Sequence, residues 1–172
     1  MQAAVLAGTL VVLGGLYIVS RQSNSGFVPK RQASFGNVTL ASVGMPEKKT
    51  TLKSCPTEKC LNIYLSPWCG VCRASTDLVK ELQPWLAERG IASRVIIGRD
   101  RPEAIDEYAK VFGPETLIDP DGVVPIKGGV PQFLISDGEG NILKRQPGVL
   151  RIVRPPIPEA ELEALSRALG LL

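Results

Sequence analysis

Two cysteines three positions apart, Cys69 and Cys72, are the residues of this sequence best suited to chemistry. They lie in the run WCGVC at 68–72, after an apolar run at 61–65 and before a helix-like stretch, where a strand would pass into a helix. Unpaired N–H groups and the positive end of the dipole at such a helix start favour thiolate over thiol. Because cysteines at this spacing face the same side, they can form a disulfide that an outside thiolate reopens. The pattern therefore predicts redox chemistry.

A Cys-x-x-Cys pair also occurs in zinc sites, in structural disulfides and as unrelated buried thiols. Cys55 and Cys60 lie just upstream, which makes a site of four thiolates an alternative. The eight residues between Cys60 and Cys69 argue against it, because they contain the apolar run, which predicts a buried strand instead of a short loop. The sequence has no His, which excludes His-containing metal sites, Cys–His nucleophile pairs and Ser–His–Asp triads. We expect no metal ion and no other cofactor.

Cys55 and Cys60 have two interpretations of their own. Outside the cytoplasm a disulfide is usually structural, and one here would pin the preceding segment to the edge of the domain. Alternatively, the two cysteines form a second redox pair that relays electrons to Cys69 and Cys72. Both interpretations stay open at the level of the sequence.

The elements downstream of the cysteines must form the scaffold that positions them. The segment after Cys72 has the apolar spacing of a helix that ends near Gly90 and contains Pro84, which should bend it. Residues 92–97 then form a strand that is joined to its neighbours through helices, which implies parallel pairing. Further along, the sequence predicts a helix at 103–112, a long loop at 115–129, a hairpin of strands at 132–136 and 141–145, and a terminal helix after Pro158. This order predicts an α/β fold, a mixed sheet with flanking helices.

The first twenty residues, 1–20, carry no charged side chain and are mostly aliphatic. As a helix they would extend about 30 Å, which is the thickness of the hydrocarbon core of a bilayer. A cleaved signal peptide is the alternative, but no Lys or Arg precedes the apolar core and no Ala-x-Ala site precedes Arg21. We therefore expect one N-terminal transmembrane helix that anchors the protein in the lipid bilayer.

Two features give opposite predictions for the side of the membrane on which the rest of the chain lies. Arg21, Lys30 and Arg31 follow the apolar segment, and positive-inside counting would place the domain in the cytoplasm. Two closely spaced cysteine pairs suit an oxidising compartment, and large domains are translocated with limited regard to flanking charge. We expect the extracytoplasmic side.

The rest of the chain divides into a linker and one domain. Residues 21–54 are polar and rich in turn-forming residues, which predicts a linker with one short strand around 37–41. Residues 55–172 are long enough for one domain with its own core. The chain has 20 Lys and Arg against 17 Asp and Glu, and because the basic residues are scattered we expect no nucleic-acid surface.

From Cys60 to Leu169 the chain resembles the thioredoxin-like family. The resemblance rests on the run PWCGVC at 67–72 and on the run GVPQF at 129–133, which leads into the predicted hairpin. It implies a thioredoxin-like fold in which Pro131, preceded by Val130, has a cis peptide bond and lies against the active-site disulfide. A cis X-Pro bond is the minority form, so its presence beside a reactive sulfur would be a specific feature of the fold.

Two positions depart from the pattern of thioredoxins proper. Those proteins usually have Gly-Pro between the cysteines, where this chain has Gly70 and Val71. They also carry a buried acid six residues before the first cysteine, and this position is Ile63 here. Both the Gly-Val pair and the Val before the proline look more like periplasmic Dsb-type enzymes of bacteria. The resemblance therefore implies a protein of the bacterial inner membrane with its soluble domain in the periplasm.

We interpret the chain as a membrane-anchored thiol-disulfide oxidoreductase. Cys69 would be the attacking thiolate, and Cys72, deeper in the helix, would resolve the mixed disulfide. Pro131, which lacks an N–H, and Val130 would frame an extended substrate segment that adds as a strand edge. The other substrate-binding candidates are Trp68, beside the first cysteine, and Gly70, which permits a close approach. The expected partners are protein thiols and disulfides as substrates, and a redox partner protein in the membrane or periplasm.

Two alternatives from other functional classes remain at this point. One is a binding or assembly module that keeps the fold and uses its thiols little. The other is a copper-handling protein that uses the soft thiolate ligands of Cys69 and Cys72. The absence of His and the presence of only two Met residues argue against copper. The motif does not distinguish oxidase, reductase and isomerase activity. These activities depend on the reduction potential of the cysteine pair, and a difference of about 30 mV in that potential corresponds to only about 1.4 kcal/mol, which is finer than a motif resolves.

Overall fold

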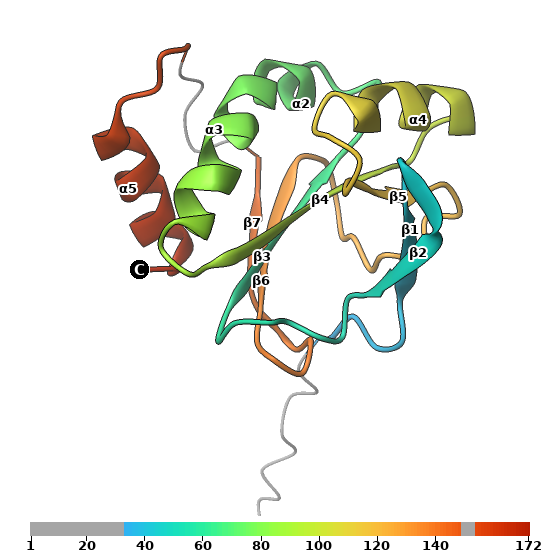
Figure 1. Cartoon of the computed structure of the whole chain (residues 1–172), viewed down its shortest axis with the longest axis horizontal. Coiled ribbons are helices and arrows are strands. Elements are labelled where there is room, and N and C mark those ends of the chain that lie inside the picture. The colour runs from blue at the N-terminus through green and yellow to red at the C-terminus, as the bar shows by residue number, and fades with distance from the viewer. Residues whose placement is uncertain (1–32, 149–153) are drawn as a thin grey trace, which may run out of the picture. The chain divides into compact units, whose positions relative to one another are not determined.

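One mixed sheet runs through the domain, with seven strands in the described residues in the order β2-β1-β5-β4-β3-β6-β7 (Figure 1). The computed structural model describes residues 33–148 and 154–172. The strands are β1 (Thr39–Ser42), β2 (Met45–Thr51), β3 (Cys60–Leu65), β4 (Ala92–Gly98), β5 (Leu117–Asp119), β6 (Gln132–Ser136) and β7 (Ile142–Pro147). The pairs β3–β4 and β4–β5 are parallel and the other pairs are antiparallel. The predicted mixed sheet, with its parallel pair and its hairpin of β6 and β7, is confirmed.

The helices are α2 (Gly70–Ala74), α3 (Thr76–Ala87), α4 (Pro102–Lys110) and α5 (Glu159–Leu169). The sequence predicts one helix from the cysteines to Gly90, but the structure divides it at Ser75. There the Ser75 hydroxyl donates to the carbonyl oxygen of Val71 at 2.7 Å, a local bond that competes with regular helix geometry. Pro84 lies inside α3, downstream of this break.

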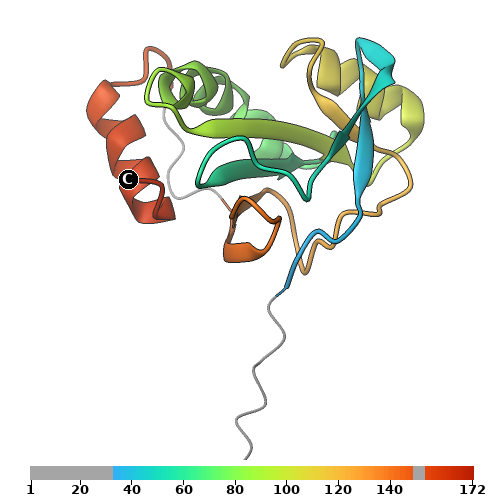
Figure 2. The ribbon, with the colours of Figure 1, turned by 60° about the horizontal axis from the view of Figure 1, so that its bottom comes forward.

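The two faces of the sheet have separate cores. Leu61, Ile63 and Leu65 of β3 lie on the face that packs against apolar residues of α3, α4 and α5. Tyr64 lies on the opposite face, whose core is closed by side chains from loops, such as Phe35 and Val124. Figure 2 shows α3 and α4 on the same side of the strands. Because all six residues of β3 are buried, this strand forms the centre of the domain.

The segment expected as a linker up to residue 54 is part of the sheet where the structure describes it. The expected strand around 37–41 is β1, and it pairs with β2, a strand that the sequence did not predict. β2 has an exposed edge that carries Glu47, Lys48 and Lys49, so it lacks the apolar alternation of a half-buried strand. Residues 33–54 therefore belong to the same compact unit as the rest of the domain.

Two further expectations concern the segment at 115–129 and the first twenty residues. The prediction of a loop over 115–129 was wrong near its start, where Leu117–Asp119 forms β5. This strand has three residues, which is too short to show an alternation of apolar and polar residues. The predicted membrane helix at 1–20 lies outside the described residues. Within the described part of the chain, no helix is both long and apolar enough to cross a bilayer.

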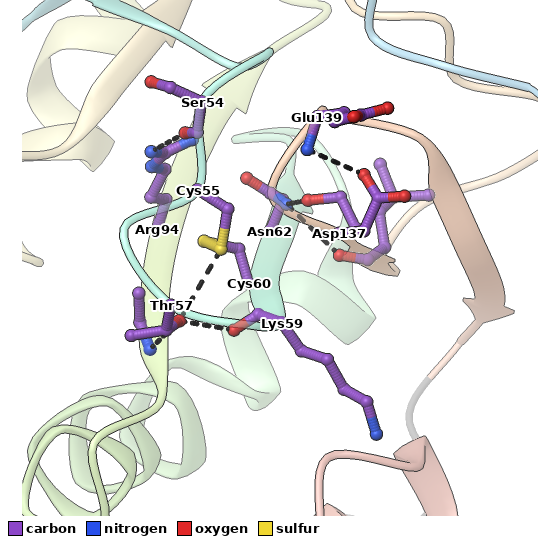
Figure 3. The surroundings of a disulfide bond; sticks show 12 residues. Ser54, Cys55, Thr57, Lys59, Cys60, Asn62, Arg94, Asp137 and Glu139 are labelled. Carbon is purple, nitrogen blue, oxygen red and sulfur yellow. Dashed lines mark hydrogen bonds between the residues drawn. A yellow bond between two sulfur atoms is a disulfide. The ribbon is translucent and has the colours of Figure 1, made fainter.

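A disulfide joins Cys55 to Cys60 where the chain enters β3 (Figure 3). The loop that it closes is also held by hydrogen bonds, since the Thr57 hydroxyl donates to the carbonyl oxygen of Lys59 at 2.7 Å. On the same side, the Arg94 guanidinium of β4 donates to the carbonyl oxygen of Ser54. Cys60 is completely buried, whereas Cys55 is half-buried. The bond thus ties the end of the β1–β2 segment to the central strand.

Breaking this disulfide should lower the stability of the domain. The variant Cys55→Ser leaves Cys60 in its buried place and should lower the free energy of unfolding by about 2 kcal/mol, because the bond restricts a short loop in the unfolded chain. Urea denaturation followed by circular dichroism measures the effect. The neighbouring exposed substitution Ser54→Ala is the control and should change stability by less than about 0.5 kcal/mol. Equal urea midpoints for Cys55→Ser and the native protein would contradict this role.

Candidate active site

Strand register brings three separate segments together beside the Cys-x-x-Cys motif. In the parallel pair, Leu65 at the end of β3 lies opposite Ile97, so the residues after β4 lie beside those after β3. In the antiparallel pair, Tyr64 lies opposite Gln132, so the residues before β6 reach the same place. The segments 66–69, 98–101 and 126–131 therefore meet at one edge of the sheet. In open α/β sheets, sites lie outside the carboxyl ends of the parallel strands, as here.

Cys69 lies at the start of α2 and its sulfur has two backbone partners. The Cys72 N–H donates to Sγ of Cys69 at 3.1 Å, and Sγ in turn lies 3.4 Å from the carbonyl oxygen of Val130. Cys69 is the N-cap of the helix, so its sulfur accepts a bond from an N–H that the helix itself leaves unpaired. That bond stabilises a thiolate at Cys69 more than a thiol.

Cys72 lies one turn further into the helix and has no exposed surface, whereas Cys69 retains 4%. Both are free thiols in the structure. Burial raises the pKa of the Cys72 thiol, and together with hydrogen bonding and charge repulsion from Cys69 it brings that pKa to about 12. Cys72 is therefore protonated at neutral pH, and Cys69 is the thiol of the pair that an outside molecule can reach.

An exposed apolar surface surrounds the first cysteine. Trp68 is 62% exposed and Val71 is 44% exposed, although both are large apolar residues. Gly70 is exposed between them, and a Cβ at this position would meet no other atom within 4 Å. The Trp68 indole N–H donates to the carbonyl oxygen of Arg99 at 2.7 Å, which fixes the ring in this exposed place. Exposed apolar side chains grouped around a reactive atom are typical of a contact surface for another molecule.

Pro131 lies immediately before β6, and the Val130–Pro131 peptide bond is cis, as the resemblance implies. Val130 is half-buried, and its carbonyl oxygen is the one that faces Cys69. The Pro131 carbonyl oxygen accepts from the Gly148 N–H at 2.8 Å. The structure therefore brings together the residues that the sequence analysis assigned to catalysis and substrate binding, namely Trp68, Cys69, Gly70, Cys72, Val130 and Pro131.

Two residues that the sequence analysis did not single out also contact this site, Arg99 and Gln132. Arg99 follows β4 and bonds to the 126–128 segment through its guanidinium and to Trp68 through its carbonyl oxygen. Gln132 begins β6, and its buried side-chain amide bonds to the same segment. A polar residue at the start of an apolar strand was a readable signal for Gln132. The position of Arg99 depends on strand pairing, which residue types alone do not encode.

The buried acid expected of thioredoxins proper is absent from the face of Cys72. Ile63 fills its position and is completely buried in the core that contains both thiols. A buried carboxylate does exist at Asp119, but it accepts from the hydroxyl of Tyr64 at 2.9 Å, on the other face of the sheet. Burial and the carboxylate of Asp119 both raise the pKa of Tyr64. Among the described residues, none of the groups that shift the pKa of Cys72 is a carboxylate.

The Cys55–Cys60 disulfide lies at the opposite end of β3 from the active site. Cys60 is the first of the six residues of β3, and the strand extends about 17 Å from it toward Cys69, at about 3.3 Å per residue. Disulfide exchange requires direct contact between sulfurs, so a relay between the two pairs in one chain does not fit this structure. The same separation rules out the four-thiolate metal site, because zinc–sulfur bonds are only about 2.3 Å long.

Comparisons with known proteins give a consistent result at the level of the fold. No protein-family model matches the sequence, and no curated protein matches it either. Among solved structures, the exposed lipoprotein thioredoxin of Streptococcus pneumoniae strain TIGR4 is 18% identical, with a TM-score of 0.58 over 78% of this chain and 98% of that chain. The chain has a thioredoxin fold.

Two further structures support the same assignment. A secreted disulfide oxidoreductase of Mycobacterium tuberculosis, described as homologous to DsbE of E. coli, is 14% identical over 79% of this chain and 96% of its own, with a TM-score of 0.53. A thiol:disulfide interchange protein of the thioredoxin family from Chlorobium tepidum is 16% identical over 83% and 99%, with a TM-score of 0.54. This thioredoxin fold therefore extends over almost the whole length of each of these proteins.

The difference between the two thiols should be visible by alkylation. At about pH 8, iodoacetamide should modify Cys69 and leave Cys72 unmodified, since only thiolates react and burial keeps the second thiol protonated. Modification of Cys72 should increase as the pH approaches 12. Mass spectrometry of proteolytic peptides identifies the modified residue.

The variant Cys69→Ala is the matched control for this experiment. It removes the hydrogen bond and the charge that Cys69 contributes, so the pKa of Cys72 should fall and its alkylation should begin at lower pH. Equal alkylation rates of the two thiols in the native protein at about pH 8 would contradict the assignment.

Proposed function

We propose that this protein is a thiol-disulfide oxidoreductase that exchanges disulfides with protein thiols outside the cytoplasm. The observation that carries the proposal is the placement of the Cys69 sulfur between the Cys72 N–H, at 3.1 Å, and the carbonyl oxygen of Val130, at 3.4 Å. A thiol placed in this way has a donor that stabilises its thiolate and a protein segment beside it that a substrate can pair with.

The reaction that this geometry supports has two exchange steps. In the first, the Cys69 thiolate attacks a substrate disulfide, so that a mixed disulfide forms and one substrate sulfur leaves as thiolate. In the second, Cys72 loses its proton and its sulfur attacks Sγ of Cys69, which releases the other substrate sulfur. The substrate disulfide gains two electrons and becomes a dithiol, with one proton from Cys72 and one from solvent, and Cys69 and Cys72 become a disulfide. The reverse sequence oxidises a substrate dithiol.

The surface around Cys69 suits an extended polypeptide as substrate. Trp68 and Val71 offer exposed apolar contacts, and Gly70 leaves open space between them. Pro131 has no N–H, so one strand-pairing donor is missing just before β6, and an extended substrate segment can lie along the backbone of Val130 there. These contacts are not specific to one side chain, which suits an enzyme whose substrates share a disulfide and little else.

We place the domain in the periplasm of a bacterium, anchored in the inner membrane by residues 1–20. The Cys55–Cys60 disulfide supports this placement, because structural disulfides persist in oxidising compartments and are rare in the cytosol. A redox partner in the membrane or the periplasm would return Cys69 and Cys72 to the state needed for the next cycle. The reduction potential of this pair, measured in the soluble domain, distinguishes an oxidant from a reductant.

Single cysteine variants test the two roles directly. Cys69→Ala should abolish exchange with a peptide disulfide, because it removes the attacking sulfur. Cys72→Ala should accumulate a mixed disulfide between Cys69 and the substrate, visible as a mass increase under non-reducing conditions. Cys55→Ser is the control and should retain exchange, since its sulfur lies at the other end of β3. Trapping by Cys69→Ala instead of Cys72→Ala would reverse the roles.

The location is tested in cells. In a Gram-negative bacterium that expresses the full chain, the protein should remain in the membrane fraction after carbonate washing, and protease added to spheroplasts should degrade the domain. A variant that lacks residues 1–20 should be soluble and protected from protease inside the cytoplasm. Protection of the full-length protein in intact spheroplasts would contradict the periplasmic placement.

A further inference from the structure

In the segment 126–129, which leads to Val130, every backbone carbonyl oxygen accepts a hydrogen bond from a side chain. The Arg99 guanidinium donates to the carbonyl oxygens of Ile126 at 3.2 Å and Gly128 at 2.9 Å. The side-chain amide of Gln132 donates to the carbonyl oxygens of Gly129, at 2.8 Å, and Lys127. Four consecutive carbonyls, at 126–129, are thus bound alternately by two side chains. The next carbonyl, of Val130, is the one that contacts Cys69.

This segment needs external support because its own sequence gives it little. Two consecutive glycines, Gly128 and Gly129, precede Val130, and glycine loses more conformational freedom on folding than any other residue. Gly128 has a φ of 81°, a conformation that other residues rarely adopt. Without the bonds from Arg99 and Gln132, the position of the Val130 carbonyl would be poorly defined.

Arg99 itself has an unusual backbone conformation. Its φ of 60° is in the left-handed region, and it is the only residue other than glycine with a positive φ in the described part of the chain. In this conformation Arg99 bonds to two parts of the site. Its carbonyl oxygen accepts from the Trp68 indole N–H, and its guanidinium donates to the carbonyl oxygens of Ile126 and Gly128. A strained conformation in an arginine, kept beside a reactive site, indicates a specific role for that residue.

We propose that Arg99 is a positioning residue for the exchange reaction. It links Trp68, on one side of Cys69, to the segment that carries Val130, on the other side. Its role rests on the proposed function, and it acts on the substrate surface and not on the thiol. The guanidinium is suited to this task because its planar fork of donors reaches two carbonyls at once, which the single ammonium of a lysine does not.

The variant Arg99→Asn separates the side-chain bonds from the backbone conformation. Asn tolerates a positive φ but is too short to reach both carbonyls. Because Lys127 is exposed and lies within the held segment, trypsin cleavage of the Lys127–Gly128 bond reports its opening. We expect cleavage about tenfold faster in Arg99→Asn, with Gln132 still restraining the segment. Arg101→Asn makes the same charge change two residues away and is the control, expected to match the native protein.

A second measurement connects the segment to the reaction. Exchange of the Arg99→Asn variant with a peptide disulfide should be about tenfold slower, which corresponds to about 1.4 kcal/mol, while alkylation of Cys69 by iodoacetamide keeps its native rate. Because iodoacetamide does not need the Val130 segment, a variant whose Cys69 had become unreactive would lose both reactions together. An unfolded variant would instead also expose Cys72 to alkylation. Arg99→Lys should recover only part of the exchange rate.

Several results would overturn this proposal. They are an unchanged Lys127–Gly128 cleavage rate in Arg99→Asn, an unchanged exchange rate despite faster cleavage, and an equal loss of exchange and alkylation. Failure of the proposed function is a different result, namely a native protein whose Cys69 does not exchange with any peptide disulfide. In that case the cleavage rate at Lys127 still tests whether Arg99 holds the segment.

Discussion

The pairing of β3 with β4 on one side and β6 on the other is the constraint on which the site depends. Because β4 runs parallel to β3, the residues after both strands leave the sheet at the same edge. Because β6 runs antiparallel to β3, the residues before it arrive at that edge as well. A shift of one residue in either register would turn side chains to the other face and separate Val130 from Cys69. The complete burial of β3 fixes both registers.

Much of this arrangement could be predicted from the sequence. Apolar runs and turn residues marked β3, β4, the hairpin and α5, and the motif at 69–72 marked the two thiols of the candidate site. The predictions failed where local pattern was weak: β2 has an exposed charged face, and β5 has three residues. Such strands form because a neighbouring strand offers hydrogen-bond partners, which residue periodicity does not report.

The support of the site was harder to predict than its reactive atoms. The thiols of Cys69 and Cys72 are recognisable because their chemistry belongs to a residue type and a spacing. Arg99 and Gln132 act through backbone carbonyls at 126–129, and any segment offers the same carbonyls. Only the register of β3 with its two neighbours brings these donors to the segment. The sequence therefore identifies the reactive groups of such a site, whereas the residues that hold these groups in position are identified only in the structure.

In the proposed reaction Cys72 must lose its proton before it attacks Cys69. Ile63 occupies the position where thioredoxins proper have a buried acid, so that acid is not there to accept the proton. Part of the rise in the pKa of Cys72 comes from hydrogen bonding and charge repulsion by Cys69. Both contributions disappear once the Cys69 sulfur is bound in a mixed disulfide, so the pKa of Cys72 falls when its thiolate is needed. The substrate thiolate released in the first exchange is a base strong enough to accept the proton. In the proposed reaction, the resolving step can therefore proceed without a buried acid, because attack by Cys69 itself lowers the pKa of Cys72.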